Sequence, residues 1–165
     1  MKRTTSAGIL SIAALAVAAL AGAGLNGAAE AQDKGPFANQ IAARHGIMLY
    51  RAMNIGALGA MAKGEVAYDA AAAQKAADNL AAAAHLDDSM LWPEGSDNGA
   101  HAGTIALPAL WADKAGFDAK YADFRAATEA MQGAAGQGLE ALQAEMGKLG
   151  PTCGACHKAY RAPTN

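Results

Sequence analysis

The stretch Cys153-Gly154-Ala155-Cys156-His157 decides how this 165-residue sequence can fold. Cys-x-x-Cys-His is the attachment signature of a c-type haem. The two thiols are three residues apart, so on a helix they lie on nearly one face and can form thioether bonds to the two vinyl groups of one porphyrin. His157 follows at once and can place an imidazole nitrogen on the iron. We therefore predict that Cys153 and Cys156 bind one haem c covalently and that His157 is its proximal axial ligand.

Other uses of a Cys-x-x-Cys pair fit this sequence less well. A redox dithiol expects a strand–helix context, and nothing around the motif has a strand pattern. A structural zinc site needs about four ligands, whereas the sequence holds two cysteines in all and no second histidine at finger spacing. A disulfide between these cysteines would close only a tiny loop.

Both cysteines continue an apolar stripe on the helix predicted over residues 139–161. The steps between its members alternate between three and four, which is the spacing of a core-facing seam in a helical bundle. We therefore expect the haem inside the bundle. Pro151 removes one helical hydrogen bond, so we expect a kink or a broken turn near Gly150-Pro151. The members of the stripe are Leu139, Leu142, Met146, Leu149, Cys153, Cys156 and Tyr160.

Three more helices are predicted upstream, over residues 37–63, 69–86 and 108–132. The first has apolar residues at helical spacing and ends at Gly64, the second consists mostly of alanine with Asp69 as N-cap, and the third has an aromatic seam. Turn-forming residues between the last two predict a loop over 87–104 that crosses the bundle. The fold class predicted is therefore all-α, an antiparallel four-helix bundle enclosing a covalently bound haem. The apolar positions are Phe37, Ile41, Met48, Ala52, Ile55 and Leu58, then Leu80 and Leu86, then Leu110, Phe117, Tyr121, Phe124 and Met131.

The first 31 residues have the features of a secretory signal peptide. Lys2 and Arg3 form a basic start, an apolar run of mostly small residues follows, and Ala29-Glu30-Ala31 is a cleavage site of the A-x-A type. An uncleaved membrane anchor is the alternative, which the small residues and the cleavage site disfavour. Export agrees with the haem prediction, because c-type haems are attached outside the cytoplasm.

Cleavage would leave residues 32–165, a length that suits one domain with a core around a flat cofactor. Removing Lys2, Arg3 and Glu30 from the totals of 13 basic and 15 acidic residues leaves 11 and 14, so the net charge is −3. This balance argues against nucleic acid as a partner. We predict a signal peptide at 1–31 and a periplasmic four-helix domain at 32–165.

Arg44 and Met48 are four residues apart on the first predicted helix, so they share one face. A methionine sulfur is a soft haem ligand that raises the reduction potential, and an arginine one turn away can pair with a haem propionate. The alternative is that Met48 only fills the core and Arg44 forms a surface ion pair. We predict Met48 as the distal axial ligand and Arg44 as the propionate partner. The remaining candidates are expected in surface or packing positions; they are His45, Met53, Met61, His85 and His101.

At these positions the sequence resembles the cytochrome c′ family over essentially the whole chain after residue 31. The resemblance implies an antiparallel four-helix bundle, often a homodimer, in a bacterial periplasm. The sequence departs from the usual pattern at Pro151 and at Ala109, where an acidic residue is common. The shared marks are Arg44-x-x-x-Met48, Lys63-Gly64-Glu65 with Tyr68-Asp69, Trp92-Pro93-x-Gly95-Ser96, Pro108-x-x-Trp111 and Gly150-x-x-Cys153-x-x-Cys156-His157-x-x-Tyr160-Arg161.

The resemblance implies two kinds of haem chemistry. High-spin members have a five-coordinate iron and bind nitric oxide or carbon monoxide, whereas low-spin members (the cytochrome c-five-five-six type) have a methionine sulfur as sixth ligand. Met48 stands at the family's distal position, and residues 58–65 look more like the low-spin kind. Some high-spin members also have methionine there without ligation. We predict an electron carrier with His157 and Met48 on the iron, and the alternative is a gas-binding protein.

Redox proteins of unknown identity are the expected partners. The resemblance also allows a homodimer and the binding of diatomic gases. Three basic residues near the end of the last predicted helix, Lys148, Lys158 and Arg161, can steer an acidic partner. The plainer interpretation is that they are a solvated helix end which complements the helix dipole. The sequence contains no nucleophile–base pair and no phosphate-binding loop, so an enzyme is not predicted.

Overall fold

The computed structural model describes residues 35–164, so the predicted signal peptide lies outside the described residues. The described chain is helical, as predicted. Two short connections join α1 to α2 and α4 to α5, and one long connection joins α2 to α3. The elements are α1 (Ala38–Ala62), α2 (Ala70–Ala84), the 3-10 helix η1 (Ser89–Leu91), α3 (Ala109–Ala112), α4 (Lys114–Ala134) and α5 (Leu139–Tyr160).

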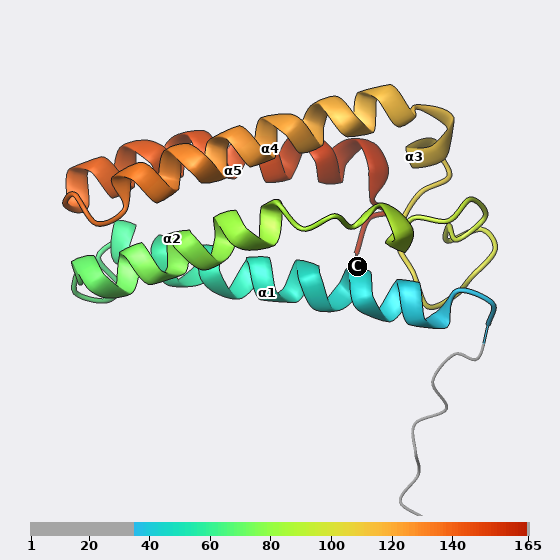
Figure 1. Cartoon of the computed structure of the whole chain (residues 1–165), viewed down its shortest axis with the longest axis horizontal. Coiled ribbons are helices and arrows are strands. Elements are labelled where there is room, and N and C mark those ends of the chain that lie inside the picture. The colour runs from blue at the N-terminus through green and yellow to red at the C-terminus, as the bar shows by residue number, and fades with distance from the viewer. Residues whose placement is uncertain (1–34, 165) are drawn as a thin grey trace, which may run out of the picture. The chain divides into compact units, whose positions relative to one another are not determined.

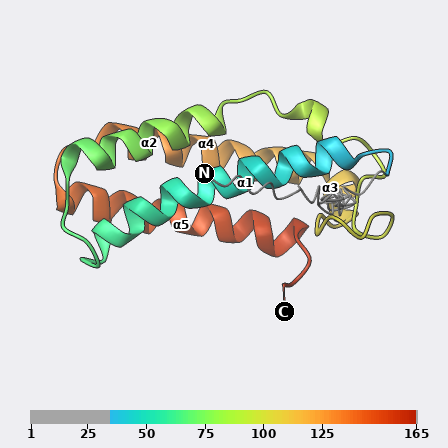
Figure 2. The same cartoon turned by 90° about the horizontal axis from the view of Figure 1, so that it is seen from below.

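The four long helices form an antiparallel bundle (Figures 1 and 2). Helix α1 packs beside α2 and α5, and α4 packs beside the same two helices, so each long helix has two neighbours. The two short connections lie at one end of the bundle, and the long connection and α3 lie at the other (Figure 1). Among residues 35–164 no helix is both long and apolar enough to cross a lipid bilayer.

The ends of α1 and α2 follow the sequence signals. Gly64 has a φ of 74°, a left-handed conformation that glycine adopts without strain, and its N–H donates to the Met61 carbonyl. The next N–H, of Glu65, donates to Ala60 at 2.9 Å, which completes a Schellman C-cap. The Asp69 carboxylate accepts the N–H of Ala72 at 2.8 Å and caps α2 as predicted.

The prediction of one helix over residues 108–132 is wrong, because the chain forms two helices there, divided at Asp113. Asp113 has φ −124° and ψ 58°, outside the helical region, and its carboxylate accepts the Gly116 N–H at 3.0 Å. An aspartate that satisfies a free backbone donor in this way starts a new helix. The chain therefore forms the short α3, turns, and then begins α4.

Helix α5 continues through Pro151, so the broken turn expected there is not observed. Pro151 is exposed, so its ring lies on the solvent side of α5. The helix also packs against α4 and α1, and tertiary packing of this kind outweighs one lost hydrogen bond.

A compact aliphatic core fills the end of the bundle with the two short connections, which we call the closed end. Its α2 contribution is mostly alanine, and such small side chains let the neighbouring helices approach closely. The predicted core stripes are confirmed, with three exceptions: Leu139 and Leu86 are 37% and 51% exposed, and Ala52 is exposed as well. The fully buried large side chains of this core are Leu58, Leu80, Met131, Leu142 and Leu149.

Candidate haem site

A cavity of about 610 Å³ lies between α1, α4 and α5, in the half of the bundle away from the closed end. Apolar and aromatic side chains make up most of its wall, and residues of the long connection complete it. All five residues predicted to contact the haem line this one cavity: Arg44, Met48, Cys153, Cys156 and His157.

Helix α5 presents the attachment motif to the cavity. Both cysteines are half-buried, and they form no disulfide. Burial raises the pKa of the Cys153 and Cys156 thiols, so both groups are protonated near neutral pH. Burial also lowers the pKa of His157, with a smaller contribution from the positive charge of Arg161 just beyond the end of the same helix. A lowered pKa keeps the imidazole neutral, which is the form that binds a metal.

These residues fit a covalently bound haem. Two thiols one helical turn apart and the adjacent imidazole face a mostly apolar cavity, as a flat macrocycle with a central iron requires. The described residues hold no group of three or more His, Cys, Asp or Glu side chains that could bind a bare metal ion. A zinc site in residues 35–164 therefore has no ligand set, whereas a haem brings its own four nitrogen ligands.

Helix α1 forms the wall opposite the attachment motif. Met48 is half-buried and lines the cavity on this side. Of its rivals, Met61 is buried in the closed-end core and Met53 is 65% exposed. His45 lines the cavity but is exposed. Met48 is therefore the methionine that faces the cavity.

The two histidines outside α1 have other contacts. His85 pairs with Glu129 at 2.9 Å on the exposed surface. His101 packs edge-on against the Phe37 ring, with 5.4 Å between the ring centroids. Neither residue lines the cavity, so both have the surface or packing roles expected of them.

Arg44 is buried and joins α1 to the long connection. One guanidinium nitrogen donates to the Ser96 hydroxyl at 2.9 Å, and the other donates to the Ser96 carbonyl and to the Thr104 hydroxyl. The guanidinium also lies 4.7 Å from the centre of the Trp92 ring. Burial lowers the pKa of Arg44, but the ordinary pKa of a guanidinium is so high that the group stays charged. The surface ion pair considered as an alternative is therefore wrong.

The long connection and the end of α5 are tied together at the mouth of the cavity. Residues Ala106 and Arg161 form an antiparallel bridge, with hydrogen bonds from Leu107 to the Tyr160 carbonyl and from Ala162 to the Ile105 carbonyl. The Tyr160 hydroxyl donates to the Asp113 carboxylate at 2.7 Å. These contacts fix the last turn of α5, and therefore His157, relative to α4.

Sequence reasoning missed Arg51, which lines the cavity and is almost completely buried. One of its nitrogens donates to the Ala83 carbonyl and to the Tyr121 hydroxyl. A signal was present in the sequence, because Arg51 follows Arg44 by seven residues and therefore lies on nearly the same helix face.

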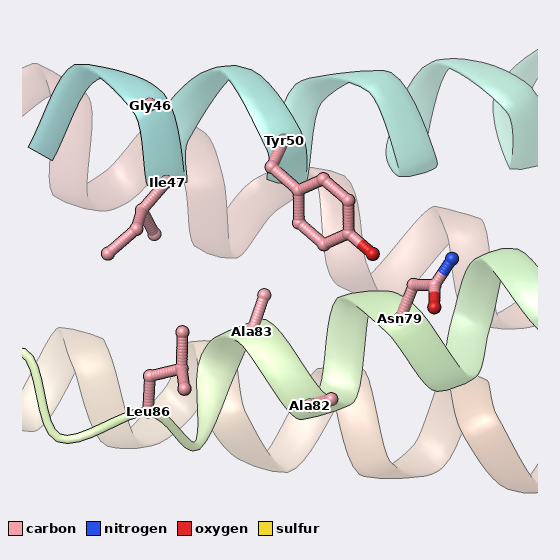
Figure 3. Close-up of a pocket in the computed structure, with 7 residues that line it drawn as sticks. All are labelled: Gly46, Ile47, Tyr50, Asn79, Ala82, Ala83 and Leu86. Carbon is pink, nitrogen blue, oxygen red and sulfur yellow. The ribbon is translucent and has the colours of Figure 1, made fainter. Parts of the chain in front are cut away.

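A second, smaller hollow lies on the outside of the bundle between α1 and α2 (Figure 3). Its volume is about 280 Å³, and Ile47 and Tyr50 of α1 face Ala83 and Asn79 of α2 across it (Figure 3). It holds none of the predicted haem residues. It is a surface groove next to exposed apolar side chains, separate from the haem cavity.

Comparisons with known proteins identify the family to which the chain belongs. The sequence profile of the family described as Cytochrome C′ matches residues 39–161. Cytochrome c-554 of Cereibacter sphaeroides is 44% identical over 133 residues, which cover 81% of this chain and 87% of the relative. Cytochrome c-556 of Agrobacterium tumefaciens is 31% identical over 124 residues, which cover 75% of this chain and 98% of the relative.

A solved structure of cytochrome c′ from Rhodobacter sphaeroides has the same fold. It matches with a TM-score of 0.75 and 40% sequence identity, and the match covers 76% of this chain and 97% of that one. The similar proteins thus have names of the c-554, c-556 and c′ types, so similarity identifies the family and not the coordination of the iron.

Proposed function

Because the chain belongs to the cytochrome c′ family, we propose that it is a periplasmic electron carrier whose haem iron is bound by His157 and Met48. Members of this family carry one covalently attached haem c, and Cys153 and Cys156 stand in the attachment motif. Such a haem takes up and releases one electron at its iron. The observation that carries the proposal is that Met48 lines the cavity on the wall opposite His157.

The residues of the chain have distinct parts in this function. Cys153 and Cys156 hold the haem to α5, and His157 and Met48 provide an imidazole and a thioether to the two faces of the iron. Two strong axial ligands change little between the oxidation states, so little reorganisation accompanies electron transfer. Arg44 has an Nε proton and one Nη1 proton beyond its three hydrogen bonds, and we expect these to bind a haem propionate.

The alternative function is gas binding by a five-coordinate iron. One solved structure with 28% sequence identity to this chain is a nitric oxide complex of a cytochrome c prime variant from Alcaligenes xylosoxidans. In that case Met48 would pack near the iron without bonding to it. The difference between the two functions therefore depends on one sulfur–iron bond.

An optical spectrum of the purified holoprotein in both oxidation states tests the proposal. We expect a low-spin spectrum with a charge-transfer band from the methionine sulfur to ferric iron, and no change on addition of carbon monoxide. Met48→Ala should make the iron high-spin and open to carbon monoxide. Met53→Ala is the matched control, because Met53 is on the same helix but exposed and outside the cavity. A high-spin wild-type protein would overturn the proposal in favour of gas binding.

The redox partner is proposed to meet the protein near the end of α5. Lys158 and Arg161 are exposed there, and Arg161 also lines the cavity mouth. Lys148, the third basic residue considered, pairs with Glu145 at 2.7 Å, so its charge is partly neutralised. An acidic partner attracted to this end would approach the haem edge, and charge-reversal at Lys158 should then slow electron transfer most at low ionic strength. A rate that does not depend on Lys158 would exclude this contact.

A homodimer is proposed through the outer face of α1 and α2. Tyr50 and Leu86 are exposed and line the groove in Figure 3. Met53 is exposed on α1 three residues after Tyr50, so it lies on a neighbouring part of the same helix face. Exposed apolar side chains gathered in this way mark association surfaces. Met53→Glu should shift the sedimentation profile toward monomer, whereas Met90→Glu, an equally exposed control in η1, should not. A wild-type protein that sediments as a monomer at all concentrations would exclude the dimer.

A further inference from the structure

Arg51 is a buried cation in the wall of the haem cavity. It follows Met48 by three residues on α1, and only 4% of its surface is exposed. Lys120 and Arg161 also line the cavity, but they are partly or fully exposed to solvent, which screens their charges. Arg44 is equally buried, but it is tied into the long connection through Ser96 and Thr104. Arg51 is therefore the buried cavity cation whose charge the haem site described above does not use.

The partners of Arg51 leave its charge only partly compensated. One Nη atom donates to the Ala83 carbonyl at 2.6 Å and to the Tyr121 hydroxyl at 2.5 Å. Among residues 35–164 its paired carboxylate is that of Asp88, at 3.8 Å. The Arg51 Nε atom is buried and has no hydrogen-bond partner among the described residues. A guanidinium in this state keeps a strong field in its surroundings, because buried charges are screened little.

Tyr121 links the arginine to its counter-ion. Its hydroxyl accepts from Arg51 and donates to the Asp88 carboxylate at 2.8 Å. Burial raises the pKa of Tyr121, so the hydroxyl keeps the proton that it donates to Asp88. The Arg51 guanidinium also lies over the rings of Tyr121 and Phe124, at 5.3 and 5.4 Å from their centres. The position of the guanidinium is therefore fixed by α4 and by the segment before η1.

The ion pair has a direction relative to the cavity. Arg51 and Tyr121 line the cavity, whereas Asp88 does not. The positive end therefore faces the haem site and the negative end lies behind it.

We propose that Arg51 is an electrostatic tuning residue that raises the reduction potential of the haem, and that Tyr121 and Asp88 hold its guanidinium at the cavity wall. Reduction adds one negative charge to the iron–porphyrin unit. A fixed positive charge nearby therefore stabilises the reduced state more than the oxidised state. The proposal needs only the haem in the cavity, and it holds whether or not Met48 bonds to the iron.

The test is the midpoint potential of purified holoprotein, measured by spectroelectrochemistry. Arg51→Gln should lower the equilibrium constant for reduction about tenfold, the order that Coulomb's law gives for one unit charge acting across a partly buried pocket. Arg51→Lys should keep most of the wild-type value. Asp88→Asn should change the equilibrium constant in the opposite direction, because it removes the negative end of the pair.

Arg125→Gln is the matched control. Arg125 contacts the same Tyr121 ring, at 4.6 Å from its centre, and donates to the Ala84 carbonyl, but it does not line the cavity. Its loss should leave the potential almost unchanged. A purely structural role of Arg51 would move the potential in the same direction for Arg51→Gln and Asp88→Asn, since both loosen the same contacts.

Two results would overturn the proposal: equal signs for Arg51→Gln and Asp88→Asn, or no shift in either. If Arg51→Gln does not yield folded holoprotein, Asp88→Asn decides the question, because a lowered or unchanged equilibrium constant for reduction in that variant overturns the proposal. Failure of methionine ligation would be seen separately, because it changes the spin state of the wild-type spectrum. None of these substitutions removes an axial ligand, so the spectrum of each variant should stay that of the wild type.

Discussion

The two ends of this bundle are built from different side chains. At the closed end, aliphatic residues from all four long helices meet in a core without charge, with Leu142 and Leu149 completely buried. At the cavity end, aromatic rings and two buried arginines surround about 610 Å³. One end thus holds the helices together by packing, and the other keeps a shaped space through hydrogen bonds and ring contacts. The difference predicts that substitutions at the two ends will affect different measurable properties.

The largest effect on stability should come from the closed end. Leu142→Ala removes a fully buried side chain and should lower the free energy of unfolding by about 2–5 kcal/mol, through lost burial and the space left behind. The optical spectrum of the haem should not change. Guanidinium unfolding of the holoprotein, recorded together with its spectrum, checks both statements. A changed spin state in this variant would show that the two ends are not separate.

A moderate effect is expected at the mouth of the cavity. Thr104→Val removes the hydroxyl that accepts from Arg44 and from the Ala106 N–H at 3.2 Å. The free energy of unfolding should fall by about 1–3 kcal/mol, because the donors on Arg44 and Ala106 lose their acceptor. The spectrum should respond as well, since Arg44 lines the cavity.

The matched control for Thr104 is Thr128, which is buried on α4 and does not line the cavity. Its hydroxyl donates only to the carbonyl of Arg125, one turn earlier on the same helix. Thr128→Val should therefore lower the free energy of unfolding by less than Thr104→Val does, and it should leave the optical spectrum unchanged. Equal spectral shifts in the two threonine variants would contradict the distinction between the ends.

The smallest effect concerns pH and the contact between Tyr160 and Asp113. Their hydrogen bond raises the pKa of Tyr160 to about 12. A raised tyrosine pKa means that this contact stabilises the fold fully below the unfolded value near 10, and that the contribution disappears as the pH rises toward 12. Tyr160→Phe should thus be less stable than wild type at pH 8, and this difference in stability should become smaller above pH 10.

The same contact also makes the stability of the fold depend on pH in the acid range. The hydrogen bond from Tyr160, and then that from the Gly116 N–H, lower the pKa of Asp113 below its ordinary value of 3.8. The contribution is therefore present above pH 3.8 and is lost as the pH falls through the lowered value. Thermal unfolding of wild type and Tyr160→Phe across the pH range tests both pH dependences. A stability difference between wild type and Tyr160→Phe that is the same at every pH would exclude this hydrogen bond as its cause.

The closed end could be predicted well from the sequence, because apolar periodicity records directly which helix face is buried. The cavity end could be predicted only for residues with a chemical signature, such as Cys153, Cys156 and His157. Arg51 was missed because its burial depends on Tyr121 and Asp88, which are 70 and 37 positions away and meet it only in the fold. The division at Asp113 was missed because apolar spacing continues from Leu110 to Phe117 across the break.

Pro151 stands at the border between the two ends on α5. Its ring carries no amide proton, so the carbonyl of Gly147 has no helical donor four residues later. The helix is continuous in shape, but this missing bond weakens the link between its two parts. Amide hydrogen exchange should reveal this as two opening units, with residues 139–149 exchanging by global unfolding and residues 152–160 by a local opening of lower free energy. Such a result would mean that the part of the helix that carries the haem opens, once its contacts with Ala106 and Asp113 are lost, without disturbing the part that holds the bundle together.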